Sequence, residues 1–206
     1  MRVEYFGHAC FLLADNNFSV IIDPFSGIGY ELANPTADFC LCSHSHFDHN
    51  ATHKVCVNKV ISPNDYNTFS WLNVISSFHD EVKGCKRWEN NIFVIEVGGF
   101  KVCHMGDLGE PFNSEICEKI GKIDILLIPV GGTYTINAKE AIEYVKKINP
   151  SLVIPMHYKT QKSQIDIAEK WEFLRSYSNV IKSKASFEIA KIPEELTVFD
   201  IDDNNF

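Results

Sequence analysis

The sequence predicts an α+β protein, and two β-sheets with helices outside would accommodate its pattern of elements. Short apolar runs typical of strands dominate the first half of the chain, and clear helical patterns occur only in the second half, where strands recur between them. The chain has 206 residues, 45% of them hydrophobic, which suits one domain over residues 1–206 with a sizeable core. No low-complexity linker and no fixed-period repeat divides it. Periodicity alone does not choose among the architectures that this pattern allows.

The expected strands are short apolar segments separated by turn residues. The first three form a meander, since Gly7-His8 and Asp15-Asn16-Asn17 separate them, and Gly98-Gly99 predicts a tight turn between two later ones. The expected strands lie at residues 3–6, 10–13, 18–22, 39–42, 74–78, 92–97, 100–103, 123–130 and 152–154, with the last ones within 185–201.

Two helices are expected in the second half. Asn137 and Glu140 form a capping-box pattern that opens a helix over 138–148. A second helix is expected over 163–177, where apolar residues recur at three-residue spacing and are interpreted as core packing: Ile165, Ala168, Trp171 and Leu174. The polar end at 202–206 is expected to be disordered.

Charge and composition exclude several partners. The formal net charge is −8, and no basic run extends beyond Lys146-Lys147, which disfavours an extended nucleic-acid surface. No secretion signal is recognised, and no apolar stretch reaches the roughly 18 residues that span a membrane. We therefore expect a cytoplasmic protein with a small-molecule substrate and no membrane partner. Two bound cations would make a locally positive pocket in this acidic protein, which suits a phosphorylated or otherwise anionic substrate.

The seven cysteines are scattered and include no C-x-x-C pair. Free, buried thiols in a reducing compartment explain them best. Cys40 and Cys42 precede the main motif, and we interpret them as two strand residues on the same face of a sheet in preference to metal ligands.

The strongest signal is the segment Ser43-His44-Ser45-His46-Phe47-Asp48-His49-Asn50, which follows an apolar strand. With 8 histidines in 206 residues, chance gives His-x-His-x-x-His only about 0.01 times in such a chain. His44 and His46 point the same way if the segment is extended, and Asp48 and His49 point apart, so two ions are within reach. Imidazole and carboxylate are the ligands that zinc takes at about 2.0–2.2 Å.

This segment resembles H-x-H-x-D-H, the hallmark of the metallo-β-lactamase superfamily. Four further motifs match that family in order: Ile22-Asp23-Pro24, Phe78-His79-Asp80, His104-Met105-Gly106-Asp107 and Ile154-Pro155-Met156-His157-Tyr158. The resemblance implies a four-layer αββα sandwich of two mixed β-sheets that pack face to face, with helices on the outer faces. It also implies two divalent metal ions, zinc first, with manganese or iron as alternatives. It implies ligand roles for His44, His46 and His79 at one ion, for Asp48, His49 and His157 at the other, and for Asp107 as a bridge. Asp23 resembles the carboxylate that orients a ligand histidine.

A narrower resemblance is to the branch that includes ascorbate-6-phosphate lactonase. It is carried by residues 128–135, by Pro155-Met156-His157-Tyr158 and by Gly7-His8-Ala9. The chain departs from the relatives at Ser43, where many have threonine, and at Trp88, where glycine is more usual. The branch does not fix a substrate, because one fold hosts many reactions.

Asp48, His104 and Tyr134 are the candidate catalytic residues. His104 is either an outer-sphere acid or base or a satisfied strand histidine. Tyr134 is either a donor to a developing oxyanion or a packed aromatic side chain. His8 is interpreted as structural.

The resulting functional prediction is a metal-dependent hydrolase with a dinuclear site. A hydroxide shared by the two metals would attack an ester-like bond, in a phosphodiester or a lactone, because coordination lowers the pKa of water from 15.7 towards about 7. The alternatives are a di-iron redox protein of the same fold and a non-catalytic binding protein. The di-iron relatives resemble H-x-E-x-D-H, whereas this chain has His46 at the glutamate position.

Overall fold

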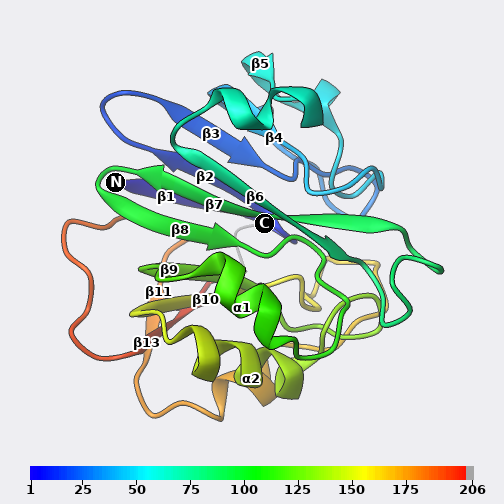
Figure 1. The fold of residues 1–206 in the computed structure, drawn as a ribbon, viewed down its shortest axis with the longest axis vertical. Coiled ribbons are helices and arrows are strands. Elements are labelled where there is room, and N and C mark those ends of the chain that lie inside the picture. The colour runs from blue at the N-terminus through cyan, green and yellow to red at the C-terminus, as the bar shows by residue number, and fades with distance from the viewer. Residues whose placement is uncertain (203–206) are drawn as a thin grey trace.

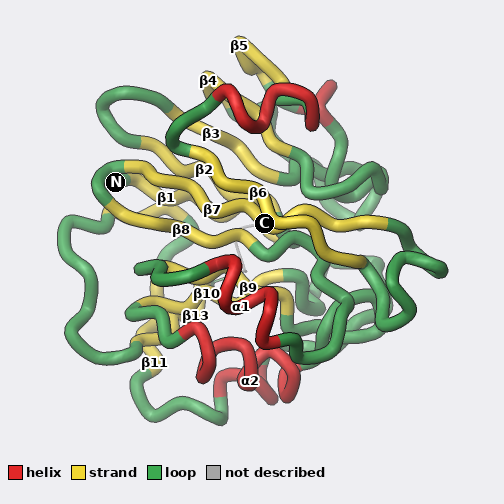
Figure 2. Tube along the Cα trace, viewed as in Figure 1, coloured by secondary structure: helices red, strands yellow, loops and turns green. Residues whose placement is uncertain are grey.

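A computed structural model describes residues 1–202, which form two facing β-sheets (Figures 1 and 2). The first sheet has six strands in the order β12-β1-β2-β3-β4-β5, and the second has seven in the order β11-β13-β10-β9-β8-β7-β6. Parallel and antiparallel pairs occur in both, so the predicted sandwich of two mixed sheets is confirmed. Most of the segment expected to be disordered, residues 203–206, lies outside the described residues.

The strands are β1 (Arg2–Gly7), β2 (Cys10–Ala14), β3 (Ser19–Ile22), β4 (Thr36–Leu41), β5 (Cys56–Val60), β6 (Leu72–Phe78), β7 (Glu89–Val97), β8 (Phe100–His104), β9 (Ile125–Pro129), β10 (Leu152–Met156), β11 (Val180–Ser183), β12 (Ser186–Glu188) and β13 (Thr197–Ile201). The helices are α1 (Ser114–Ile120), α2 (Ala138–Ile148) and α3 (Trp171–Leu174), with 3₁₀ turns η1 (Thr52–Lys54) and η2 (Pro63–Thr68). The sequence did not indicate β5, β11 or α1, whose apolar patterns are short.

The alternation of side chains along β2 shows how the first sheet is buried on both faces. Phe11 and Leu13 belong to the main core between the sheets, whereas Cys10 and Leu12 point to the other face. There they pack against side chains of the segment between β3 and β4, namely Phe25, Ile28 and Leu32. The layer over this sheet is thus irregular chain held by its own apolar side chains.

Helices cover the outer face of the second sheet, where Figure 1 shows α1 and α2 beside each other, and α2 packs on β9. The predicted capping box at the start of α2 is present. The Asn137 side chain accepts from the backbone N–H of Glu140 at 3.2 Å, and the Glu140 carboxylate accepts from the Asn137 N–H at 2.9 Å. The helix ends at Asn149, which adopts the left-handed conformation. No helix within residues 1–202 is long and apolar enough to cross a bilayer.

The helix predicted over 163–177 is wrong except for the single turn of α3. Backbone groups in this segment bond to distant chain: Gln164 N–H donates to the Ile28 carbonyl and Ala168 N–H to the Gly131 carbonyl, both at 2.8 Å. These partners replace the i to i−4 bonds of a helix. The predicted core packing of its apolar residues is wrong for Ala168, which is exposed, and for Trp171, which is 46% exposed. Leu174 lies in the main core and Ile165 packs against the second apolar cluster, as expected.

The direction of the strands places the predicted metal ligands at the same edge of the sheets. The strands β1, β3 and β4 run the same way in the first sheet, and β6, β8, β9 and β10 do so in the second. Parallel strands end at the same edge, so the loops that follow them lie together. Every histidine or aspartate that the sequence motifs marked as a metal ligand lies in one of these loops.

Replacing Asn137 by alanine removes the side-chain acceptor at the start of α2, so we expect the free energy of unfolding to fall by about 1 kcal/mol. Urea denaturation measures this change. Asn137→Asp is the matched control, because it keeps an acceptor of the same size. Equal stability of the alanine variant and the wild type would show that the box does not stabilise α2.

Candidate metal centre

Eight histidine and aspartate side chains converge at the shared edge of the two sheets. They form three overlapping groups whose potential ligand atoms lie within 4.8 Å of one another. All seven predicted ligands are present, and the eighth member is His8: the groups are His44, His46 and His79; His8, Asp48, His49 and His157; and His44, His49 and Asp107. The chain therefore holds a histidine and aspartate cluster suited to binding metal.

Hydrogen bonds fix which nitrogen of His44 and His79 faces the centre. His79 Nδ1 lies 3.0 Å from the Tyr134 carbonyl oxygen, which can only accept, so Nδ1 carries the proton. Ser43 Oγ donates to Asp23 and therefore accepts from His44 Nδ1 at 2.9 Å. In both rings Nε2 is left with a lone pair. His44 Nε2 is buried and has no hydrogen-bond partner among residues 1–202.

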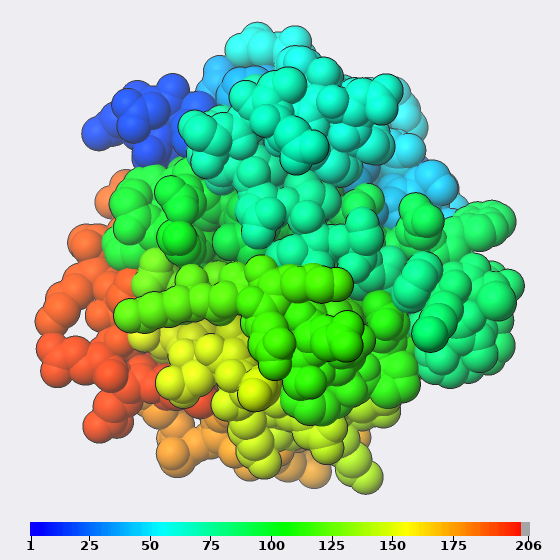
Figure 3. All heavy atoms as spheres, viewed as in Figure 1, coloured from blue at the N-terminus to red at the C-terminus, as the bar shows by residue number. Residues whose placement is uncertain are grey.

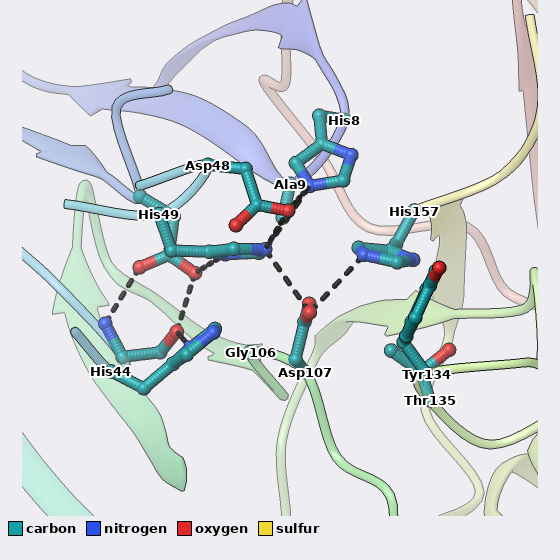
Figure 4. Close-up of polar contacts among 12 residues, drawn as sticks. His8, Ala9, His44, Asp48, His49, Gly106, Asp107, Tyr134, Thr135 and His157 are labelled. Atoms are coloured by element: carbon teal, nitrogen blue, oxygen red, sulfur yellow. Dashed lines mark hydrogen bonds and ion pairs between the residues drawn. The ribbon is translucent and has the colours of Figure 1, made fainter. Parts of the chain in front are cut away.

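Asp107 lies at the middle of the cluster (Figure 4). Its Oδ2 atom is 3.1 Å from Nε2 of His49, 3.1 Å from Nε2 of His157 and 3.3 Å from Nε2 of His79. Its Oδ1 atom is buried and lacks a hydrogen-bond partner in the described chain. A single carboxylate thus faces histidines from both predicted ligand sets.

Asp23 supports the cluster from behind. Its buried carboxylate accepts from the Ser43 N–H at 2.6 Å, from Ser43 Oγ at 2.7 Å and from His49 Nδ1 at 2.9 Å. His49 therefore presents Nε2 to the centre. The geometry matches the orienting role expected for Asp23, and Ser43 supplies the hydroxyl that a threonine would supply.

The expected extended shape of the main motif is wrong. Residues 43–49 form consecutive bends and a turn, in which His49 N–H donates to the His46 carbonyl at 3.0 Å. Although the segment is not a strand, His44 and His46 still lie together, with ring centroids 4.7 Å apart.

Burial and charge act strongly on these groups. Burial lowers the pKa of His44 to about 3 and that of His8 to about 4. Burial opposes the charge on His49 as well, but Asp107 and Asp23 outweigh it and raise the pKa of His49 well above its usual value. Burial disfavours ionised Asp107, yet His157 and His49 hold the pKa of this carboxyl well below its usual range. Such shifts are typical of functional sites.

The candidate catalytic residues have different surroundings. Asp48 and Tyr134 line a cavity of about 630 Å³ with His46, His79, Asp107 and His157. His104 is fully buried, with Nε2 against the Ala9 carbonyl at 2.8 Å and Nδ1 accepting from Gly106 N–H at 3.1 Å. Both its nitrogens are thus engaged by backbone, which favours the structural alternative for this residue. A hollow of about 660 Å³ near Asn17 and Gly98 has no histidine in its lining.

One wall of the cavity is organised by Asp80, directly after His79. Its carboxylate accepts four backbone N–H groups at 2.7–2.9 Å, from Val82, Gly84, Lys86 and Arg87. The connection between β6 and β7 that they form projects from the molecule at the right edge of Figures 1 and 3. It places Arg87 in the cavity lining and the Trp88 ring 5.5 Å from that of His46. Trp88 has a φ of 70°, which explains why glycine suits this position.

Comparison with known proteins gives the family. A model of the β-lactamase superfamily domain matches residues 2–157. This chain belongs to that superfamily. It is 36% identical to a protein from Thermotoga maritima described as a Zn-dependent hydrolase of the metallo-β-lactamase superfamily, with a TM-score of 0.80 and 97% of each chain covered. It is also 27% identical to a UPF0173 metal-dependent hydrolase from Carboxydothermus hydrogenoformans, over 78% of this chain and 85% of the relative. The predicted superfamily, fold and enzyme class, a metal-dependent hydrolase, are confirmed.

Membership of the superfamily does not determine which reaction a protein catalyses. CmlA, a diiron β-hydroxylase from Streptomyces venezuelae, shares the fold with a TM-score of 0.52 and 18% identity, over 76% of this chain and 44% of CmlA. At that identity the similarity concerns the fold alone, and the site has to supply the rest.

The lowered pKa values predict acid sensitivity of the metal-free protein. Histidines with a lowered pKa, such as His8 and His44, bind protons more readily in the unfolded chain. Their contribution to stability is present above pH 6.5 and is lost as the pH falls towards about 4. His49 does not offset this loss, because a raised pKa makes its contribution constant below pH 6.5. We expect the urea midpoint of chelator-treated protein to fall between pH 6.5 and 4.5, and a constant or rising midpoint would contradict this reading.

Proposed function

We propose that this protein binds two divalent cations and hydrolyses an ester-like bond, in a phosphodiester or a lactone. The observation that carries the proposal is the position of Asp107. Its Oδ2 atom is within 3.3 Å of histidines from both ligand sets, so one carboxylate can serve two ions at once. Zinc is the first ion to test, with manganese and iron as alternatives, because imidazole and carboxylate donors suit all three.

The histidines and aspartates of the cluster fit two metal ions. His44, His46 and His79 would hold one ion; Asp48, His49 and His157 would hold the other, with Asp107 between them. Buried atoms without a hydrogen-bond partner in the described chain, His44 Nε2 and Asp107 Oδ1, support the assignment, since an unpaired buried polar atom costs free energy. The other nitrogen of each of two histidines is bonded to a fixed acceptor: His49 to Asp23 and His79 to the Tyr134 carbonyl.

When bound, the ions supply activation of water near neutral pH and neutralise charge on the reacting group. The chain supplies the remaining parts. Asp23 and Ser43 keep the imidazoles in the tautomers that can ligate. Tyr134 lies beside His157 in Figure 4 and lines the cavity, where its hydroxyl can donate to an oxygen that becomes negative.

Arg87 supports an anionic substrate. Its guanidinium lies 5.3 Å from the centre of the Tyr134 ring and lines the cavity, and no carboxylate of residues 1–202 forms an ion pair with it. A cation held in this way at a metal pocket can bind a phosphate or carboxylate on the part of the substrate that does not react. A cavity of about 630 Å³ has room for such a group beside the scissile bond.

Asp107→Asn keeps the size of the side chain and removes its charge, so we expect both ions to be weakened and turnover to fall by orders of magnitude. Inductively coupled plasma analysis after zinc loading should give about two ions for the wild type and fewer for the variant. His79→Ala and His157→Ala should each weaken mainly one ion.

Asp15→Asn is the control for this experiment. The Asp15 carboxylate accepts three backbone N–H groups, from Asn17, Phe18 and Gly98, and it lies outside the cluster. It should lose stability and keep both ions. Two ions retained in Asp107→Asn, with only a lowered melting temperature, would show that the bridging assignment is wrong.

The substrate class is tested by a screen of the metal-loaded protein with phosphodiesters, phosphomonoesters, lactones and thioesters. Chelator should abolish the activity found, and added metal should restore it. Activity that survives exhaustive chelation would contradict the proposal. Turnover that needs iron and a reductant would favour the redox alternative.

Arg87→Gln should raise KM about tenfold for a substrate with a remote anionic group, which corresponds to about 1.4 kcal/mol, and leave its neutral analogue unchanged. Lys86→Gln is the matched control, since Lys86 is adjacent, pairs with Glu81 and does not line the cavity. Equal effects of Arg87→Gln on both substrates would show that Arg87 does not select for the anion.

A further inference from the structure

His8 is a buried histidine that the metal-ligand motifs do not include. It follows β1 in the turn to β2, and it is only 2% exposed. Its Nε2 atom lies 3.2 Å from Asp48 Oδ2 and 3.1 Å from His49 Nε2 (Figure 4). Its ring centroid is 4.2 Å from that of His157. Three of the residues assigned to the second ion therefore surround this one imidazole.

The backbone of His8 is held in an unfavourable conformation. Its φ of 55° lies in the left-handed region, which a side chain with a Cβ adopts at a cost. Two donors hold the residue there: the Tyr5 hydroxyl bonds to the His8 carbonyl at 2.8 Å, and the His157 N–H bonds to the same oxygen at 2.7 Å. The second bond crosses from the first sheet to the second, since His157 follows β10. The fold thus fixes this imidazole against the cluster.

An ionised carboxylate can only accept, so a hydrogen bond to Asp48 requires a proton on His8 Nε2, and the surrounding hydrogen bonds leave one acceptor for that proton. His49 donates Nδ1–H to Asp23, so Nε2 is the nitrogen that can bind an ion once it has lost its proton. When the Nε2 lone pair is used for coordination, His49 can no longer accept from His8. Asp48 Oδ2 is then the acceptor that remains within hydrogen-bond distance of His8 Nε2.

We propose that His8 is a positioning residue that donates Nε2–H to the Asp48 carboxylate and orients it towards the second ion. This inference rests on the proposed dinuclear function. Asp48 needs such a partner because its side chain is 16% exposed and comes from a turn, whereas His8 is rigidly held. Partners of this kind contribute about 10- to 100-fold to metal affinity.

The experiment measures the affinity of each ion by zinc titration against a competing chelator, without any substrate. His8→Asn is the main variant, since asparagine tolerates the left-handed backbone and is too short to reach Asp48. We expect the second ion to bind about 10- to 100-fold more weakly and the first ion to be unchanged. His8→Gln places an amide donor near the former Nε2 position and should recover most of the loss. Metal-free melting temperatures check that each variant folds.

Two further measurements separate positioning from ligation. In a double-mutant cycle, His8→Asn should cost little when Asp48 is already asparagine, because its effect passes through that carboxylate. The cobalt-loaded protein should keep its visible absorption spectrum in His8→Gln, since no ligand nitrogen is lost.

Unchanged second-ion affinity in His8→Asn would overturn the inference, as would equal weakening of both ions. A cobalt spectrum that changes in His8→Gln would show that His8 is itself a ligand. Failure of the proposed function looks different: the wild type would then bind a single ion, whatever residue 8 is.

Discussion

The buried carboxylate of Asp107 is the constraint on which the rest of the site depends. A charge removed from water is tolerated only if opposite charges or donors surround it. Three imidazole nitrogens lie within 3.3 Å of its Oδ2 atom, and the cations of the proposed function would supply the opposite charge between them. Those imidazoles are also buried. Two of them have a partner for the other nitrogen, whereas His157 Nδ1 has none in the described chain. Asp23 and the Tyr134 carbonyl fill this role for His49 and His79. Burial of Asp107 and its neighbours thus requires polar partners even among residues that no ion would touch.

The direction of the strands brings these polar groups together. Strands of the two sheets end at one edge, so the loops that follow these strands carry the site together. Several site residues adopt positive φ values, among them His8 at 55°, Asp23 at 50° and His157 at 50°. Such conformations cost free energy and persist where tertiary bonds impose them, as the bond from His157 N–H to the His8 carbonyl does. The strain is concentrated where the two sheets meet around the cluster.

The connection between β6 and β7 forms a different part of the site. It carries His79 at its start, and the Asp80 carboxylate accepts four backbone N–H groups from the rest of it. It places Arg87 in the cavity lining and the exposed Trp88 ring beside that of His46. A rigidly held cluster can be combined with walls of different side chains, which is how one fold supports many reactions.

The sequence by itself determined the strands of the meander, the capped helix α2 and the seven histidines and aspartates of the proposed metal centre. Each depends on local information: alternating apolar residues, a capping pair, and histidines and aspartates at fixed spacing. Only the tertiary structure decided which residues act together across long separations. It replaced the helix expected over 163–177 by loop, because Gln164 and Ala168 found backbone partners at Ile28 and Gly131. It also brought His8 to Asp48, 40 residues away, which no local pattern encodes because the contact depends on how two sheets meet.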